Sequence, residues 1–580
     1  MDKKTYLICV ILSLTTYIFS QQYQLLDNGG FERSLANWET EINNAAEATF
    51  NIITTNSPHS GRNMLEVNVT KRVSATNSVK LIYDSISTDT EKIYMVRFWA
   101  KSAQANSRMF ITFIGENTNT KCEFRIDDAF GSWKNGWQMY QYLFTSKDDY
   151  IKMDISFNTI GIYYLDDFEI IDDTHPVLDL KTQLMWQNNL TGYGWASGDN
   201  DVSVVLPDGR VAWIFSDSFL GWPNPNEYYL REGTMINNLI VVEDLDGKLT
   251  TLYAGTQSSP KTLVTSSKGI YWVGDGIIEN NKLIVMYNEW GGLDYNNSAG
   301  VATFSLPNLT LEKKIVSAYK GSDIPNALLQ EDDYTYIYTE MRSGFARYTR
   351  VARVPAGQLN NPDTQWEFYT KTNTWDTDLS QAKQIVTAPG CSVRKLGEGN
   401  YVMSGVPNLS SDFCVWFSQT PYGPWGNKTV LYKIPSEEGV LFYLGHIHNR
   451  PESETTGVYT LSYSLYPFGG TVPQQRADKG TYLPIYMKAN LKELSPYTPL
   501  SSVNQLRTES TIRIFPNPSF DILNIEGVQE VTNIQILNLT GQIVTETQTR
   551  TVDVSALEYG TYIARVTHSK GIDNRMFIKN

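Results

Sequence analysis

The stretch "SGDNDVSVVLPDGRVAWIFSDSF" at residues 197–219 contains two short apolar runs separated by a Pro-Asp-Gly turn. Runs of β-branched and aromatic residues on either side of such a turn predict a β-hairpin. Asp199, Asp201 and Asp217 lie at the ends of the runs that are remote from the turn. Because the start of one antiparallel strand faces the end of its partner, we expect Asn200 across from Asp217. The three aspartates are therefore predicted to gather at one rim of the hairpin.

The hairpin pattern recurs through residues 181–500. The first strands of the repeats are "DNDVSVVL", "WVGDGIIE", "IPNALLQE", "PGCSVRKL" and "YLGHIHNR". Each is followed by a turn, a partner strand and further strands, over roughly 50–70 residues, which is typical of a propeller blade. The sequence therefore predicts a five-bladed β-propeller, and a pair of sandwiches is the alternative. Strand signals also dominate the rest of the chain, so the predicted class is all-β.

The same register argument places further polar groups at one end of the predicted channel: Asp275 near Tyr287 and Glu289, Asn326 near Glu340 and Arg342, and His446 and His448 at the start of the fifth repeat. Acids brought together repel one another and have no evident packing role. Two carboxylates flanking a bond are what glycoside cleavage requires. We predict these catalytic residues: Asp199, Asp217, Asp275, Asp201 and Glu340. We predict these substrate-binding residues: Trp195, Trp222, Trp272, Glu289, Arg342 and His446.

Each candidate also has a structural interpretation. Asp and Asn often cap turns in β-proteins. Arg342 could pair with Glu340 or Glu331, His446 could line the channel, and many of the tryptophans could pack between blades. In the fourth repeat "APGCSV" carries no acid. The prediction of a catalytic rim depends on the whole set of acids that lie together there, and mainly on Asp199 and Asp217.

Composition narrows the class of protein. The 580 residues favour several domains, and the net charge of −14 argues against nucleic acid as the main partner. Only 19% of residues are charged, whereas Tyr (35) and Trp (14) are plentiful. These side chains combine a packing ring with a polar edge, which suits sugar binding and also any β-rich surface.

The N-terminus indicates export. Residues 1–20 combine two lysines, an apolar core and a small residue, the pattern of a secretory signal peptide. We find no other apolar run of membrane-spanning length, and we expect an exported monomer. The few cysteines suggest that the domains fold without bridges, with a Cys391–Cys414 pair left open.

Residues 22–173 open with "LLDNGGFERSLANWE" and close with "IGIYYLDDFEIID". This segment resembles jelly-roll carbohydrate-binding modules related to families 4, 9 and 22. The resemblance implies a possible structural Ca²⁺ held by Glu32 and Asp167, since hard carboxylate oxygens suit calcium; solvated turn residues would look the same. Trp133 and Trp137 are predicted stacking faces, and Trp99 a core residue.

Residues 508–580 contain "PNP", "LTGQ" and "GTYIARV" in order. The segment resembles the type A C-terminal sorting domain of the type IX secretion system of Bacteroidetes. The resemblance implies an Ig-like sandwich, the secretion machinery as a partner, and a location outside the cell or on its outer surface.

The middle segment resembles five-bladed furanosidase-type propellers, including glycoside hydrolase families 43, 32 and 117. More closely, "SVVLPDGRVAWIFSDSFLG" followed by "INNLIVVED" resembles the DUF4185 and DUF5005 families. Some DUF4185 relatives are endo-acting D-arabinanases, which implies catalytic roles for Asp199 or Asp201 and for Asp217. Ser216 and Ser218 depart from the usual Gly and Thr, and Cys391 stands where family 43 has a glutamate.

Together these features favour an exported glycoside hydrolase that needs no cofactor for catalysis, with a polysaccharide or oligosaccharide as its substrate. A surface glycan-binding protein without catalysis is the second hypothesis. A polysaccharide lyase is the third.

Overall fold

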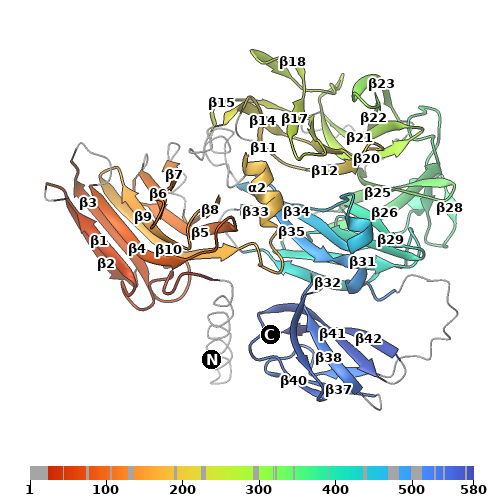
Figure 1. Cartoon of the computed structure of the whole chain (residues 1–580). Helices are drawn as coiled ribbons and strands as arrows, with labels where there is room; N and C mark the ends of the chain where they lie inside the picture. The colour runs from red at the N-terminus through yellow and green to blue at the C-terminus, as the bar shows by residue number, and fades with distance from the viewer. Residues whose placement is uncertain are drawn as a thin grey trace.

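The structure is a computed structural model of the 580-residue chain (Figure 1). It describes residues 24–43, 45–55, 57–73, 78–104, 107–127, 136–188, 192–223, 230–291, 299–317, 319, 323–343, 346–390, 392–435, 440–467, 482–497, 512–527, 531–539, 542–568 and 571–579. The predicted signal peptide, Trp133 and Cys391 lie outside these ranges. Within them, no helix has the length and apolar character needed to traverse a membrane.

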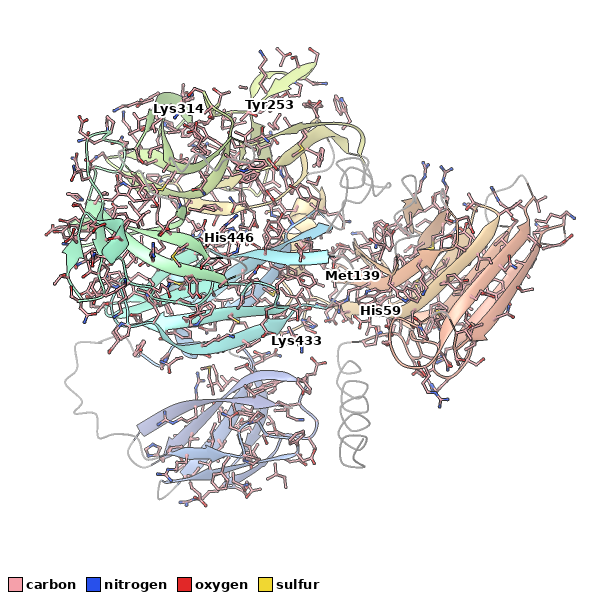
Figure 2. All side chains as sticks on the ribbon, turned by 180° about the vertical axis from the view of Figure 1, so that it is seen from behind. His59, Met139, Tyr253, Lys314, Lys433 and His446 are labelled. Atoms are coloured by element: carbon pink, nitrogen blue, oxygen red, sulfur yellow. The ribbon has the colours of Figure 1, made fainter. Side chains whose placement is uncertain are left out.

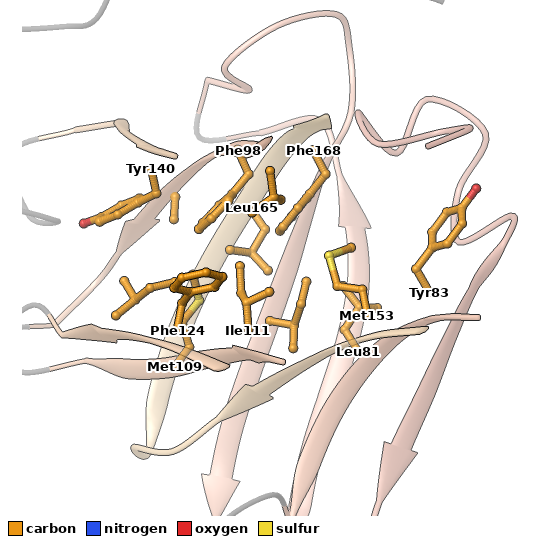
Figure 3. Packing of buried hydrophobic residues seen from close by; sticks show 14 of the residues in the cluster. Leu81, Tyr83, Phe98, Met109, Ile111, Phe124, Tyr140, Met153, Leu165 and Phe168 are labelled. Carbon is orange, nitrogen blue, oxygen red and sulfur yellow. The ribbon is translucent and has the colours of Figure 1, made fainter. Parts of the chain in front are cut away.

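The N-terminal module is a sandwich of two five-stranded antiparallel sheets. The first has the order β1 (Trp38–Ile42), β4 (Val79–Ser87), β9 (Tyr150–Phe157), β6 (Arg108–Gly115) and β7 (Lys121–Asp127). The second has the order β2 (Glu47–Ile53), β3 (Met64–Lys71), β10 (Gly161–Asp172), β5 (Ile93–Ser102) and β8 (Gln138–Thr145). Alternate residues of each strand point into one apolar core, where Phe98 and Phe168 stack with ring centroids 4.8 Å apart (Figure 3).

The middle of the chain is a β-propeller built from five antiparallel sheets. Their strands, from the innermost outward, are as follows: β12 (Val202–Val205), β13 (Val211–Phe215), β16 (Leu239–Glu243), β17 (Leu249–Leu252); β20 (Ile270–Glu279), β21 (Lys282–Trp290), β22 (Ala299–Ser305), β23 (Thr310–Val316); β24 (Ile324–Glu331), β25 (Tyr334–Ser343), β26 (Ala346–Pro355), β27 (Glu367–Tyr369), β28 (Trp375–Asp376); β29 (Ser392–Gly397), β30 (Asn400–Gly405), β31 (Asp412–Ser418), β32 (Gly426–Lys433); and β33 (Val440–His448), β34 (Val458–Pro467), β35 (Ile485–Asn490). The five first strands contact one another in a closed ring, from β12 through β20, β24 and β29 to β33 and back to β12.

A segment that precedes the first sheet adds to the last sheet of the propeller. Leu178 forms an antiparallel bridge with Met487 of β35, so residues next to the N-terminal module extend the last sheet. The backbone N–H of Lys488 donates to the carbonyl oxygen of Val177 over 2.7 Å. Helix α2 (Leu180–Asn188) follows, and its Trp186 packs into the core of the first sheet.

A second sheet is inserted into the first repeat. It consists of β11 (Gly194–Gly198), β14 (Ser218–Pro223) and β15 (Leu230–Ile236), and a small hairpin of β18 (Ala254–Thr256) and β19 (Ser259–Lys261) lies near it. The other helical segments in the described ranges are short: η3 (Leu379–Gln381), α3 (Ser453–Thr456) and α5 (Leu491–Leu494). The insertion matters because its junction with the first sheet carries the predicted acids.

The C-terminal domain is a sandwich of two sheets with one apolar core. The sheets have the order β36 (Arg513–Phe515), β37 (Ile522–Glu526), β40 (Thr551–Asp553), and the order β39 (Ile543–Thr547), β38 (Val531–Leu537), β41 (Gly560–His568), β42 (Gly571–Lys579). It lies against the propeller near β32, where Thr561 Oγ1 donates to the carbonyl oxygen of Val430 over 3.1 Å (Figure 1).

The all-β class is confirmed, with a sandwich at each end and a propeller between them. The closed ring of five sheets excludes a pair of sandwiches for the middle segment. Cys414 is a buried free thiol.

Candidate functional site

Asp199 and Asp217 lie at the junction between the first propeller sheet and the inserted sheet. Asp199 connects β11 to β12, and Asp217 connects β13 to β14. The N–H of Asp199 donates to the carbonyl oxygen of Asp217 over 3.1 Å, and the N–H of Ser216 donates to the carbonyl oxygen of Asp199 over 3.0 Å. The two aspartates are therefore neighbours across one kinked hairpin. The turn predicted Asn200 in the position opposite Asp217, which is one residue away from the observed Asp199.

The kink comes from Asn200. Its φ of 58° lies in the left-handed region that Asn tolerates better than most residues. Its Nδ2 donates to Ser216 Oγ over 2.9 Å, so Asn200 faces Ser216 and not Asp217 as predicted. The one-residue difference places Asp199, and not Asn200, beside Asp217.

Burial and the neighbouring Asp217 favour a protonated Asp199 carboxyl group, whereas two tyrosine hydroxyl groups favour its charged form. Burial and then repulsion by Asp217 raise the pKa of Asp199 to about 7. Tyr443 donates its hydroxyl hydrogen to Asp199 Oδ2 over 2.6 Å, and Tyr482 is a second hydrogen-bond partner. Oδ1 is buried and receives no hydrogen bond from the described residues. Because an unsatisfied buried carboxylate oxygen is costly, this arrangement favours retention of a proton.

The Asp217 carboxyl group has different contacts. Asn237 Nδ2 and Trp272 Nε1 both donate to Asp217 Oδ1, over 2.9 and 3.0 Å. Burial raises the pKa of Asp217, and these two donors act in the opposite direction by stabilising the charged form. Burial thus raises the pKa values of both adjacent acids, and the charge of Asp217 raises the pKa of Asp199 further.

Asp201 belongs to a buried network and does not share this setting. Its side chain is fully buried, its Oδ2 lies 3.3 Å from His448 Nε2, and Ser462 Oγ donates to its Oδ1 over 2.9 Å. Burial raises the pKa of Asp201, but the attraction of His448 outweighs it and the net shift is downward. We assign Asp201 to packing of the ring, because no part of its carboxyl group is open to a substrate.

Asp275 also differs from the prediction. A bulge between Val273 and Asp275 places Asp275 across from Met286, whereas Val273 faces Tyr287. The buried Asp275 carboxylate accepts a hydrogen bond from the N–H of Leu328 on the next sheet over 2.8 Å, and Arg394 Nη1 lies 3.7 Å away. Its contacts connect three sheets of the propeller, which is a structural arrangement.

Glu340 is an ion-paired residue in the structure. Its Oε1 accepts from Arg342 Nε over 2.7 Å and from Arg347 Nη1 over 2.5 Å, and its side chain is 11% exposed. Asn326 Nδ2 lies 3.4 Å from Glu340 Oε2, in agreement with the predicted proximity of Asn326, Glu340 and Arg342. Both of its arginine partners would have to be displaced before this carboxylate could contact a substrate.

The predicted aromatic platforms have different surroundings. Trp272 contacts Asp217 and stacks on Trp290 with ring centroids 4.8 Å apart, beside the acid pair. Trp222 is 55% exposed and makes an edge contact with Tyr193. Trp195 is fully buried against Trp186 and Phe215, so its prediction as a sugar platform is wrong. The Gly-rich context that suggested a surface position belongs to the tightly packed β11.

Glu289 and His446 lie beneath the rim. Glu289 is 4% exposed and accepts a hydrogen bond from the Ser266 hydroxyl group. The two nitrogens of His446 lie 2.9 Å from Asn200 Oδ1 and 3.2 Å from Ser392 Oγ, inside the propeller (Figure 2). His446 therefore supports the kink at Asn200 and fits the alternative of a channel-lining imidazole.

Glu32 and Asp167 do not gather a cation site among the described residues. Glu32 Oε1 accepts from the backbone N–H groups of Arg62 and Asn63, over 2.7 and 3.0 Å. Asp167 Oδ2 lies 2.6 Å from His59 Nδ1, and Ser60 Oγ donates to its Oδ1. In the part of the chain that is described, no group of three or more His, Cys, Asp or Glu residues fits a metal ion. A structural Ca²⁺ held by Glu32 and Asp167 therefore stays a prediction.

Sequence reasoning missed Tyr443, Tyr482 and Asn237. The two tyrosines come late in the chain, more than two hundred residues after Asp199, and no local spacing marks them. The sequence could have pointed to Asn237, because this residue lies in the motif "INNLIVVED", most of which follows the inserted sheet.

A family model matches the C-terminal segment of the chain. Residues 513–580 match the family described as Secretion system C-terminal sorting domain, so the protein is exported through the type IX secretion system to the cell surface or the extracellular space. No curated protein matches the sequence.

Three solved structures illustrate what the chain is similar to. A candidate hydrolase from Bacteroides ovatus ATCC 8483 is 23% identical, with coverage of 55% of this chain and 91% of that chain and a TM-score of 0.46. A GH43_1 enzyme from Xanthomonas citri is 14% identical, with coverage of 52% and 92% and a TM-score of 0.32. A CBM22-1 xylan-binding domain from Paenibacillus barcinonensis is 11% identical, with coverage of 26% and 91% and a TM-score of 0.19. Residues 185–484, more than half of the chain, match a further family, and the protein belongs to this family, described as Domain of unknown function (DUF5005).

Proposed function

We propose that the propeller is a glycoside hydrolase in which Asp199 and Asp217 cleave a glycosidic bond of a polysaccharide. The observation that carries the proposal is the pair of neighbouring carboxyl groups at one hairpin, where burial and the charge of Asp217 raise the pKa of Asp199. Glycoside cleavage needs one carboxylic acid that carries a proton and one carboxylate that activates water or attacks the anomeric carbon. The sequence resemblance to DUF4185 relatives supports the same two positions.

We assign the acid role to Asp199 and the carboxylate role to Asp217. Asp199 would donate its proton to the leaving oxygen, since burial and the neighbouring charge raise its pKa to about 7. Asp217 would act as the carboxylate, since Asn237 and Trp272 donate to it and so stabilise its charged form against the effect of burial. Trp272 would also position Asp217 through this hydrogen bond, and its ring, stacked on Trp290, would offer a sugar-binding face.

The pH dependence of cleavage follows from this assignment. Activity should fall about tenfold per pH unit above about pH 7, because Asp199 then loses its proton. The same raised pKa means that the folded chain binds this proton more tightly than the unfolded chain, so the free energy of unfolding should decrease as pH rises from 3.8 to about 7. A profile of kcat/KM against pH checks the first point. A rise in activity through pH 7 would reverse the two roles.

Replacement of Tyr443 should move that profile in a known direction. The Tyr443 hydroxyl group lowers the pKa of Asp199, so Tyr443→Phe should shift the alkaline limb upward by roughly 1–2 pH units. Tyr459→Phe, a buried tyrosine in the same sheet, is the matched control and should leave the profile unchanged. An unshifted limb in Tyr443→Phe would show that Asp199 does not set it.

The alternatives predict different products. A panel of plant, algal and mycobacterial polysaccharides is incubated with the purified protein, and new reducing ends are measured. Hydrolysis gives reducing ends, a lyase gives unsaturated ends that absorb ultraviolet light, and a glycan-binding protein without catalysis gives neither. If the protein is a hydrolase or a glycan-binding protein without catalysis, the N-terminal module would hold the polysaccharide near the propeller.

A further inference from the structure

The C-terminal sorting domain carries an apolar row on the outer face of its larger sheet. Leu537, Ile563 and Met576 lie directly opposite one another on β38, β41 and β42. Their neighbours Ile536 and Ala564 point into the domain's own core, so the row points away from that core. The outer face of an antiparallel sheet that meets water is usually polar. The row therefore indicates a surface that contacts another part of the protein.

The propeller covers this apolar row. The side chains of Leu537 and Ile563 are 0% and 1% exposed, although neither belongs to the core of the sorting domain. They belong to an apolar cluster that also contains residues of β32, of the segment after it and of α5, namely Leu431, Ile434, Leu491 and Leu494. Separation of the two domains would expose both apolar surfaces to water, which costs free energy.

Polar contacts beside the row define how the two domains fit together. Thr561, on the same face of β41, donates to a carbonyl group of β32. The backbone N–H of Asn490 donates to the carbonyl oxygen of Leu539. Arg565 Nη2 lies 3.1 Å from Glu493 Oε1. These contacts come from separate strands of each domain, so they specify one orientation of the sorting domain on the propeller.

The sorting domain contacts the end of the last propeller sheet that is remote from the acid pair (Figure 1). Tyr482, a partner of Asp199, lies just before the start of β35. Asn490, a partner of the sorting domain, lies at the end of the same strand. The length of β35 therefore separates the sorting domain from Asp199 and Asp217.

We propose that the propeller binds the sorting domain as a non-covalent partner, which stays bound when the chain between Tyr497 and Ile512 is cut. A domain held only by its covalent connection would diffuse away after the cut, because the connection supplies its whole effective concentration. A domain held by the apolar row and the contacts beside it keeps its place. A cut in this connection therefore does not by itself release the sorting domain from the protein.

The test cuts the full chain at one place and measures whether the two pieces separate. A recognition site for a specific protease is introduced within residues 498–511, and the protein is cut at about 10 μM and studied by sedimentation velocity. Micromolar or tighter binding keeps most of the sorting domain on the propeller at this concentration. We expect one boundary that contains both pieces. Two separate boundaries would overturn the proposal.

Two isoleucine variants test which surface is responsible. Ile563→Asp places a charge in the centre of the apolar row and should weaken binding between the cut pieces by at least about tenfold. Ile522→Asp makes the same change on the smaller sheet of the sorting domain, where Ile522 is 47% exposed, and should leave binding unchanged. Melting curves of the uncut variants check folding. Wild-type binding in Ile563→Asp, or an equal loss in both variants, would contradict the proposed surface.

The ion pair provides a test that does not depend on Ile563. Arg565→Glu should weaken binding by about two- to fivefold, because the two side chains are partly exposed, at 28% and 26%. The double variant Arg565→Glu/Glu493→Arg restores opposite charges and should recover the lost affinity. A single variant that binds as the wild type does, or a double variant that recovers nothing, would refute the proposed orientation.

This inference does not depend on the proposed function. Ile563→Asp should cleave glycans at the wild-type rate, because the sorting domain lies away from the acid pair. Asp217→Asn should leave the cut pieces bound to each other for the same reason. Pieces that separate while glycan cleavage persists would overturn the docking alone. Pieces that stay together in a protein that cleaves no glycan would contradict the hydrolase alone.

Discussion

Replacement of Asp217 by asparagine should lower the rate of glycan cleavage by roughly 10²–10⁴-fold, the range typical of a lost acid–base group. Asparagine keeps the shape of the side chain, and its amide oxygen can still accept from Asn237 and Trp272. It cannot take a proton or act as a carboxylate nucleophile. The loss should therefore appear in kcat, while glycan binding and the melting temperature change little.

The same substitution has a second signature. Because the charge of Asp217 contributes to the raised pKa of Asp199, its removal should move the alkaline limb of any residual activity to lower pH. Asp208→Asn, an exposed aspartate in the turn of the same hairpin, is the matched control and should retain full activity. Full activity in Asp217→Asn would remove Asp217 from the mechanism.

Replacement of Asp201 by asparagine should instead lower the free energy of unfolding of the propeller by about 1–3 kcal/mol, the range for a buried polar group that loses its partner. Asp201 and His448 are fully buried partners, and Ser462 donates to Asp201. The amide would remove the carboxylate that faces His448 Nε2 inside the propeller. Thermal or urea unfolding checks this, with Asp208→Asn expected within about 0.5 kcal/mol of the wild type.

The Asp201→Asn result distinguishes a catalytic role of Asp201 from a structural one, which the sequence alone does not do. A stable Asp201→Asn variant with greatly reduced cleavage would assign Asp201 to catalysis and contradict the structural role. A destabilised variant whose folded fraction cleaves at the wild-type rate would support it. Because the chain has three domains, the propeller transition needs a signal of its own, such as the fluorescence of the propeller tryptophans.

The hairpin at residues 197–219 shows how far sequence reasoning reaches. Its turn residues and apolar runs specified the pairing of β12 with β13, and this pairing brought Asp199 to Asp217. The left-handed Asn200 shifted the register by one residue, which apolar patterning does not reveal. At Asp275 a bulge next to Gly274 changed which residue faces the partner strand, and the acid turned toward the neighbouring sheet.

Contacts between distant repeats were beyond the sequence. Asp199, Asp201 and Asp275 look alike in sequence, as acids near strand starts, and their partners distinguish them: Tyr443, His448 and Arg394 come from other sheets. Trp195 was misjudged for a related reason, because its burial depends on Trp186 of a helix outside the repeats. Local patterns predicted where acids would lie, and tertiary contacts determined which of them remain available for chemistry.

Mass spectrometry of products formed in H₂¹⁸O tests the central claim most directly. The account predicts that the wild-type protein incorporates ¹⁸O at each new reducing end of the polysaccharide it cleaves, and that neither Asp199→Asn nor Asp217→Asn produces such ends at a comparable rate. Unsaturated products without the label, or labelled ends formed at the wild-type rate by either variant, would contradict the assignment of this aspartate pair to glycoside hydrolysis.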